Sequence, residues 1–356
     1  MKAIRILACL VSVVIVGFGT AAKADLLAIT TSNGDLDTRD HANLGPAGAG
    51  GAVSFGGGVP VRAALNSLNE LGVGFTPNAG ADVRSILNVG SDCCGATFGS
   101  PPGQFTAVTA LASDDFALGG DNGAVFLRSR TNLGAGAPGS GGDGTIFNSQ
   151  VNAIAQLSNG HLVLANNGGE IFVRDYADIT QDAPGTSSAY VNFGIPITGL
   201  AITASDDIVI GLAGGGVDTR PWANVVSSHG DINFGIGGAT RVALRSDGNV
   251  ALGFGNGEVH VRNPYDLGPD LGNSANFGTA ITALTVDKDD NFVIGRSSGH
   301  VNVRQAGNVG QVPAGFLGDD INFGVSILSL NIVPEPATVL LLGIGLSVLR
   351  FLRRVR

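Results

Sequence analysis

The chain has 356 residues, of which 56 are glycine and only 6% are aromatic. This composition, with short apolar runs bounded by turns, favours an all-β array over a helical or doubly wound α/β fold. Between Asp25 and Val333 there are 28 acidic and 13 basic residues, a net charge of −15, which argues against nucleic acid as a partner because phosphate binding needs a basic surface.

Residues 1–24 have the pattern of a secretory signal peptide. Two basic residues precede the apolar run Ile6–Phe18, which is short for a membrane span, and Ala22-Lys23-Ala24 supplies the small residues that signal peptidase requires. Cleavage after Ala24 is expected, so that the mature chain begins near Asp25.

From Leu26 onward the chain repeats a unit of four short strands about seven times. The last copy, Ile281 to Gly324, reads ITALTV, FVIGR and HVNVR separated by turns, then a loop and INFG. The copies are 41 to 49 residues apart, and a period of this length is typical of solenoids and propellers.

Four marker residues recur in the unit. An arginine ends the third strand, at Arg39, Arg84, Arg128, Arg174, Arg220, Arg262 and Arg304. Five residues earlier stands a glycine, at Gly34, Gly123, Gly169, Gly215, Gly257 and Gly299, with Ala79-Gly80 as a shifted copy. Four residues after the arginine stands Asn43, Asn88, Asn132, Asp178, Asn224, Asp266 or Asn308, always followed by an aliphatic residue. A phenylalanine marks the fourth strand, at Phe55, Phe98, Phe147, Phe193, Phe234, Phe277 and Phe323.

Each marker has a structural interpretation. The glycine is expected at positive φ in a tight hairpin, and the Asn or Asp is expected to bond its own backbone and tolerate the left-handed region. The phenylalanine is expected to pack one sheet against the next. The arginine is expected to bond loop carbonyls or an acidic turn of its own blade. Residues present in every copy are thus interpreted as scaffold.

The two ends of the repeat region complement each other. The first copy, from Leu26, has no preceding strand of the ITALTV type, whereas Ile327 to Ile332 is such a strand with nothing after it. This arrangement resembles the end-to-end closure of seven-bladed β-propellers, in which one blade combines strands from both termini. The chain lacks the Trp-Asp ending of WD repeats and the double glycine of Kelch repeats.

Blade 2 diverges most, and its loop carries Cys93-Cys94, the only cysteines left after the signal peptide is removed. Adjacent cysteines leave three alternatives: a vicinal disulfide, pairing between molecules, or free thiols. A metal site is not expected, because structural zinc needs four ligands at wider spacing.

Three consecutive blades carry an aromatic residue in the loop after the arginine: Tyr176, Trp222 and Tyr265. Loops on one rim of a rigid scaffold often carry binding sites. One interpretation is a platform on which sugar rings stack. The other is that these amphipathic rings cap the ends of their blades.

No catalytic or cofactor motif is present. The five histidines stand at unlike positions, and there is no metalloprotease, nucleophile-elbow or phosphate-loop pattern. Acidic turns between first and second strands lack the glycine and glutamate of a calcium loop and are interpreted as hairpin turns. No catalytic residue, metal or cofactor is therefore predicted, although carboxylates from different blades could meet at the axis.

The tail VPEPATVLLLGIGLSVLRFLRRVR combines Pro334, Glu335 and Pro336 with an apolar run, Ala337 to Leu349, and a cluster of arginines. It resembles the PEP-CTERM sorting signal of exosortase substrates. That resemblance implies transient anchoring in the inner membrane, arginines in the cytoplasm, and processing near the motif by an exosortase-type enzyme, in Gram-negative bacteria that make exopolysaccharide. A plain tail anchor would not explain the Pro-Glu-Pro.

The sequence therefore predicts a signal peptide over 1–24, a seven-bladed β-propeller of four-stranded blades over 25–333, and a membrane-spanning sorting helix within 334–356. The expected role is structural or binding, at the cell surface or in the extracellular matrix, with exopolysaccharide as the expected partner. The alternative is a secreted polysaccharide-processing hydrolase or lyase, which would need convergent carboxylates at the axis.

Overall fold

The computed structural model describes residues 26–333, apart from 56–60, 76–79, 99–103, 141–144, 272–273, 315 and 317–319. The predicted signal peptide with its cleavage site at Ala24, and the predicted sorting segment with Pro334, Glu335 and Pro336, lie outside the described residues. Within the described part of the chain, no helix is long and apolar enough to cross a membrane.

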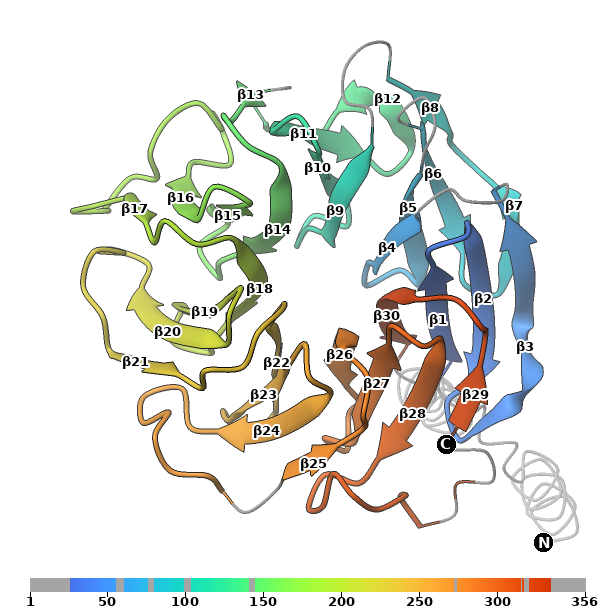
Figure 1. Cartoon of the computed structure of the whole chain (residues 1–356). Coiled ribbons are helices and arrows are strands. Elements are labelled where there is room, and N and C mark those ends of the chain that lie inside the picture. The colour runs from blue at the N-terminus through green and yellow to red at the C-terminus, as the bar shows by residue number, and fades with distance from the viewer. Residues whose placement is uncertain are drawn as a thin grey trace, which may run out of the picture. The chain divides into compact units, whose positions relative to one another are not determined.

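Seven antiparallel sheets stand around a common axis, as Figure 1 shows from blue to red. Each sheet is one blade with four successive strand positions, so the predicted all-β seven-bladed propeller is confirmed. The innermost strands are β30 (Ile327–Val333), β4 (Val61–Leu65), β9 (Phe105–Ala110), β14 (Val151–Gln156), β18 (Ile197–Ile202), β22 (Arg241–Leu244) and β26 (Ile281–Val286), for blades 1 to 7 in order. The second strands are β1 (Leu26–Thr31), β5 (Glu70–Phe75), β10 (Phe116–Gly120), β15 (Leu162–Asn166), β19 (Asp207–Leu212), β23 (Val250–Gly253) and β27 (Phe292–Arg296).

The outer half of each blade holds the marker residues. The third strands are β2 (Asp35–Asp40), β6 (Gly80–Ser85), β11 (Ala124–Ser129), β16 (Glu170–Arg174), β20 (Gly216–Pro221), β24 (Glu258–Arg262) and β28 (His300–Arg304). The outer edges are β3 (Asn43–Ser54), β7 (Asn88–Asp92) with β8 (Ala96–Thr97), β12 (Asn132–Gly136) with β13 (Thr145–Ile146), β17 (Tyr190–Asn192), β21 (Gly230–Asn233), β25 (Ser274–Asn276) and β29 (Asp320–Asn322). In blades 2 and 3 the two short outer strands both pair with the third strand.

Blade 1 combines the two ends of the ring. Strand β30 lies beside β1 (Figure 1) and pairs antiparallel with it. This pairing places Leu26 opposite Val333 and Ile29 opposite Leu330. Ile327 of β30 is fully buried beside Leu27 and Ile29. The predicted closure is confirmed, and the inner edge of β1 is covered by β30.

The hairpin glycines connect the start of the third strand to the marker phenylalanine by a backbone hydrogen bond. Gly34, Gly123, Gly169, Gly215, Gly257 and Gly299 all have φ between 85° and 98°. The carbonyl of each accepts the backbone N–H of its own blade's marker phenylalanine, for example Phe147 to Gly123 at 2.8 Å. A Cβ on Gly123 would lie 1.7 Å from that phenylalanine's carbonyl oxygen, so this position requires glycine for space as well as for φ.

The Asn or Asp after each arginine acts mainly through its side chain. Asn43, Asn132, Asp178 and Asn308 each accept the N–H two residues ahead. None of them lies at positive φ, so the predicted use of the left-handed region is wrong. That backbone conformation is found instead in the turns between first and second strands, at Asn69, Asp114, Asp206 and Asp290. The aliphatic residue that follows the Asn or Asp is at most 2% exposed in every copy.

Those turns link the blades in pairs. In three places a serine donates two hydrogen bonds to an aspartate carboxylate in the next blade, one from its backbone N–H and one from its hydroxyl. The distance from the serine nitrogen to the carboxylate oxygen is 2.7 to 3.0 Å, and each of these aspartates has a positive φ. The carboxylates are therefore engaged between blades, which supports the interpretation of these segments as structural turns. The pairs are Ser67 with Asp114, Ser158 with Asp206 and Ser246 with Asp290, joining blades 2 to 3, 4 to 5 and 6 to 7.

Cys93 and Cys94 form a vicinal disulfide. Of the three alternatives left open by the sequence, the structure selects this one. The pair lies in the loop after β7, and the N–H of Cys93 donates to Val83 O of the third strand at 3.0 Å. The disulfide therefore belongs to the outer edge of blade 2, where β7 and β8 share the pairing with β6.

Candidate functional site: the axial channel and the rim

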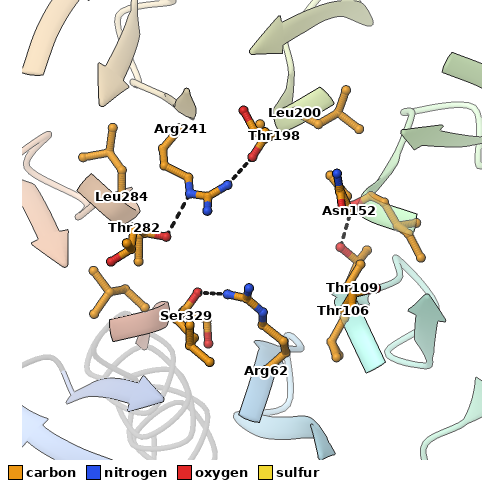
Figure 2. Close-up of a pocket in the computed structure, with 18 of the residues that line it drawn as sticks. Arg62, Thr106, Thr109, Asn152, Thr198, Leu200, Arg241, Thr282, Leu284 and Ser329 are labelled. Carbon is orange, nitrogen blue, oxygen red and sulfur yellow. Dashed lines mark hydrogen bonds between the residues drawn. The ribbon is translucent and has the colours of Figure 1, made fainter. Parts of the chain in front are cut away.

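The seven innermost strands surround one cavity of about 280 Å³ on the propeller axis, and residues from all seven line it. Figure 2 looks into this cavity with its lining side chains drawn as sticks. An innermost strand pairs within its blade on one side only, so its other edge faces the channel with open backbone groups. The wall of the channel therefore needs polar side chains that can satisfy those groups.

Side chains at the second position of the inner strands meet this need. Thr106 Oγ1 donates to Val151 O at 2.6 Å, Asn152 Nδ2 to Ile197 O at 2.7 Å, and Thr198 Oγ1 to Thr240 O at 3.1 Å. In each case the acceptor belongs to the next blade. These hydrogen bonds join the inner strands around the axis, and they explain why short polar residues stand in otherwise apolar strands.

Blades 2 and 6 place an arginine at the equivalent point instead: Arg62 is the second residue of β4, and Arg241 is the first residue of β22. Arg241 of blade 6 donates from Nε to Thr282 O at 2.8 Å and from Nη1 to Thr198 O. Arg62 of blade 2 donates from Nη1 to Leu328 O. In Figure 2 both side chains reach into the channel from different sides of the ring, with their guanidinium groups toward its interior.

The positive charges of these two arginines have no carboxylate partner in the described lining of the channel. Among the described residues that line the cavity there is no Asp or Glu. Burial and, secondarily, the charge of Arg241 lower the pKa of Arg62 to about 10. Burial also lowers the pKa of Arg241. Because the folded pKa of Arg62 is below the unfolded value, charging it opposes folding at every pH below about 10, and this penalty is relieved as the pH rises above 10.

The three rim aromatics occupy similar places, each against the preceding blade. Tyr176 is half-buried on the core of blades 3 and 4, its hydroxyl donates to Pro138 O at 3.3 Å, and burial raises its pKa. Trp222 is also half-buried, with its ring centroid 6.0 Å from that of His161 in blade 4. Both rings contribute to packing between blades.

Tyr265 differs because 47% of its surface is exposed. Its hydroxyl is hydrogen-bonded to Ser205 at 2.6 Å and to Asp207 at 2.8 Å, both in blade 5. The ring of His229 stands at 71° to it, with the centroids 6.1 Å apart. Tyr265 is therefore held in one orientation at the junction of blades 5 and 6, with polar groups beside an accessible face. Sugar stacking on the three rings stays a prediction.

The repeated arginines make structural contacts, of which the sequence predicted some and missed others. All three of Arg39, Arg84 and Arg220 bond carbonyls of their own blades. Arg220 bonds the loop at Val225 and Val226, as predicted, whereas Arg39 bonds Gly45 in strand β3 and Arg84 bonds Val89 in strand β7. Their acidic partners, however, stand two residues earlier in the same strand and not in a turn. Every repeated arginine also places its guanidinium 4.8 to 5.6 Å from a ring centroid of the preceding blade's marker phenylalanine, in the pairs Arg39 on Phe323, Arg84 on Phe55, Arg128 on Phe98, Arg174 on Phe147, Arg220 on Phe193, Arg262 on Phe234 and Arg304 on Phe277.

No family model and no curated protein matches the sequence. Among solved structures, the fold is similar to the computationally designed Ika8 protein, with a TM-score of 0.59, 18% identity, and coverage of 86% of this chain and 90% of that one. It is similar to the C-terminal WD40 domain of Sif2, with a TM-score of 0.57 and 13% identity over 86% and 82% of the two chains. It is also similar to BamB from Moraxella catarrhalis, with a TM-score of 0.54 and 10% identity over 85% and 86%. At these identities the likeness establishes the propeller fold alone.

Proposed function

We propose that the protein is exported to the cell surface or extracellular matrix and binds polysaccharide there. The observation that carries the binding role is Tyr265, whose exposed ring is held by hydrogen bonds of its hydroxyl to blade 5 and flanked by Asp207 and His229. A sugar ring has one apolar face and a rim of hydroxyls, so it matches an aromatic face with polar neighbours. A ring that is already ordered also loses little conformational entropy on binding.

The alternative, a polysaccharide-processing enzyme, has less support. Glycoside cleavage normally uses two carboxylates on either side of the scissile bond. The axial channel, which that hypothesis favours as the active site, presents two guanidiniums in its lining. The exported location is supported by the signal-peptide pattern over 1–24 and the resemblance of 334–356 to an exosortase sorting signal.

A glycan array probed with the protein, purified in mild detergent, is expected to show retention on polysaccharide fragments without release of shorter products. Tyr265→Ala should weaken binding to the positive glycans about fivefold, since losing one stacked ring costs on the order of 1 kcal/mol. Tyr190→Ala is the matched control, because Tyr190 is 43% exposed on blade 4 and its hydroxyl bonds only its own blade's Glu170 among the described contacts. Binding that both variants retain equally would remove Tyr265 from the site, and product in the positive wells would favour the enzyme.

The location has its own test. Replacing Pro334, Glu335 and Pro336 by alanine should leave export intact, because the amino-terminal signal is unchanged, and should trap the protein as a membrane-bound precursor. Cell fractionation with immunoblotting follows the precursor and the processed form over time. Normal release of mature protein from this variant would contradict processing at the Pro-Glu-Pro segment.

A further inference from the structure

The axial channel carries two positive charges at places where other blades use an uncharged side chain for the same hydrogen bonds. Thr106, Asn152 and Thr198 satisfy the open inner-strand carbonyls of their neighbours without any charge. Arg62 and Arg241 do the same with a guanidinium, and neither has an ion pair within the described part of the chain. Both arginines are half-buried at the channel wall, and a charge that is withdrawn from water without a charged partner carries a desolvation penalty.

Both guanidiniums also keep donors that face the channel. A guanidinium has five N–H donors. The protein uses one from Arg62, toward Leu328 O, and two from Arg241, toward Thr282 O and Thr198 O. These backbone bonds hold each guanidinium in place, so the remaining donors are presented to the cavity in fixed directions. Fixed guanidinium donors match the oxygens of carboxylate, sulfate and phosphate groups better than any other ligand chemistry.

We propose that the axial channel is an oxyanion-binding site in which Arg62 and Arg241 together hold a carboxylate, sulfate or phosphate group. At about 280 Å³ the cavity lies at the small end of ligand pockets, which suits a single anionic group or one acidic sugar residue. The anion compensates two charges from opposite parts of the ring and joins blade 2 to blade 6. The site is independent of Tyr265, which contacts blade 5 on the rim.

Isothermal titration at constant ionic strength tests the site, with sulfate as the probe and chloride as the background. Saturable binding is expected for the parent protein, with at least tenfold weakening in Arg62→Gln and in Arg241→Gln. Arg130→Gln is the matched control, since Arg130 is paired with Glu70 away from the channel, and it should bind sulfate as the parent does. No saturable binding, or equal binding by all three variants, would overturn the proposal.

A second arm separates the source of the oxyanion. Glucuronate and glucose are titrated beside sulfate: binding of sulfate and glucuronate but not of glucose indicates an acidic sugar, whereas binding of sulfate or phosphate without binding of glucuronate indicates a free inorganic anion. Tyr265→Ala should leave these titrations unchanged, and Arg62→Gln should leave neutral-glycan retention on the array unchanged. Failure of the rim site and failure of the channel site are thereby distinguished.

Folding of the channel variants can be checked independently. Removing one unpaired charge is expected to leave the anion-free melting temperature equal to or above that of the parent, by differential scanning calorimetry. Crystals of the parent soaked in selenate provide a measurement that needs no variant. An anomalous peak within hydrogen-bonding distance of both guanidiniums is expected, and a channel without such a peak would overturn the proposal.

Discussion

A chain that ends at Gly324 is expected to melt more than about 10 °C below the parent, because it lacks the strand that closes the ring. The truncation removes β30, which forms the innermost position of blade 1 and pairs with β1 along six residues. It also removes Ile327, which is fully buried, and Leu330, which is 9% exposed. Loss of two such side chains costs about 2 to 5 kcal/mol each, and about 1 kcal/mol corresponds to a shift of roughly 2 to 4 °C in proteins of about 150 to 250 residues.

The matched control for this truncation is a chain that ends at Val333, which keeps β30 and lacks the tail. Its thermal transition, followed by circular dichroism, should coincide with that of the parent ring. The sharper variant Ile327→Asp keeps the chain length and places a charge in the core beside Leu27. If the chains ending at Gly324 and Val333 melt at the same temperature, β30 is not needed for closure.

The architecture could be predicted because it depends on local and repeated signals. The hairpin glycines of six blades lie at positive φ, so each position is fixed relative to the strands on both sides. The incomplete first copy and the unmatched strand at Ile327 determined how the ring closes. Each of these signals requires only the order of residues along the chain and the geometry of one blade.

The contacts between blades could not be predicted in the same way. The phenylalanine under each repeated arginine belongs to the preceding blade, as in Arg220 on Phe193. Both residues were visible as markers, but their pairing depends on the angle at which one sheet packs on the next. The serine and aspartate of the first turns show the same difficulty, since Ser158 and Asp206 lie 48 residues apart. The serine occurs in blades 2, 4 and 6 and the aspartate in blades 3, 5 and 7, so this pattern repeats every two blades. Aligning the copies one blade at a time does not reveal it.

The channel arginines were missed for a related reason. Arg62 and Arg241 stand where Thr106, Asn152 and Thr198 stand in other blades, so each is an exception within the inner-strand pattern. A comparison of the copies at that one position would have singled them out. Their importance, however, comes from the closed ring, which brings blades 2 and 6 to a common axis, where the described lining residues include no carboxylate.

The repeated arginines connect the two levels of the structure, the single blade and the ring. Within blade 5, Arg220 donates from Nη2 and Nε to Asp218 Oδ2 at 2.5 and 3.0 Å, and from Nη1 to Val226 O at 2.6 Å. Toward blade 4, its guanidinium lies 5.2 Å from the centroid of Phe193. One side chain thus anchors the loop after its own strand and stabilises the contact with the neighbouring sheet, through charge-assisted hydrogen bonds and a cation–π interaction.

Arg220→Ala is therefore expected to lower the free energy of unfolding by about 3 to 5 kcal/mol, because it leaves Asp218, which is 4% exposed, as a buried carboxylate without its cation. The measurement is equilibrium unfolding in urea. Arg220→Lys should recover only part of the loss, since an ammonium cannot reproduce the forked donors. The double variant Asp218→Ala with Arg220→Ala should be more stable than Arg220→Ala alone, because no charge remains unpaired. A double variant as unstable as the single one would show that the loss comes from the loop and Phe193 contacts, and not from the carboxylate.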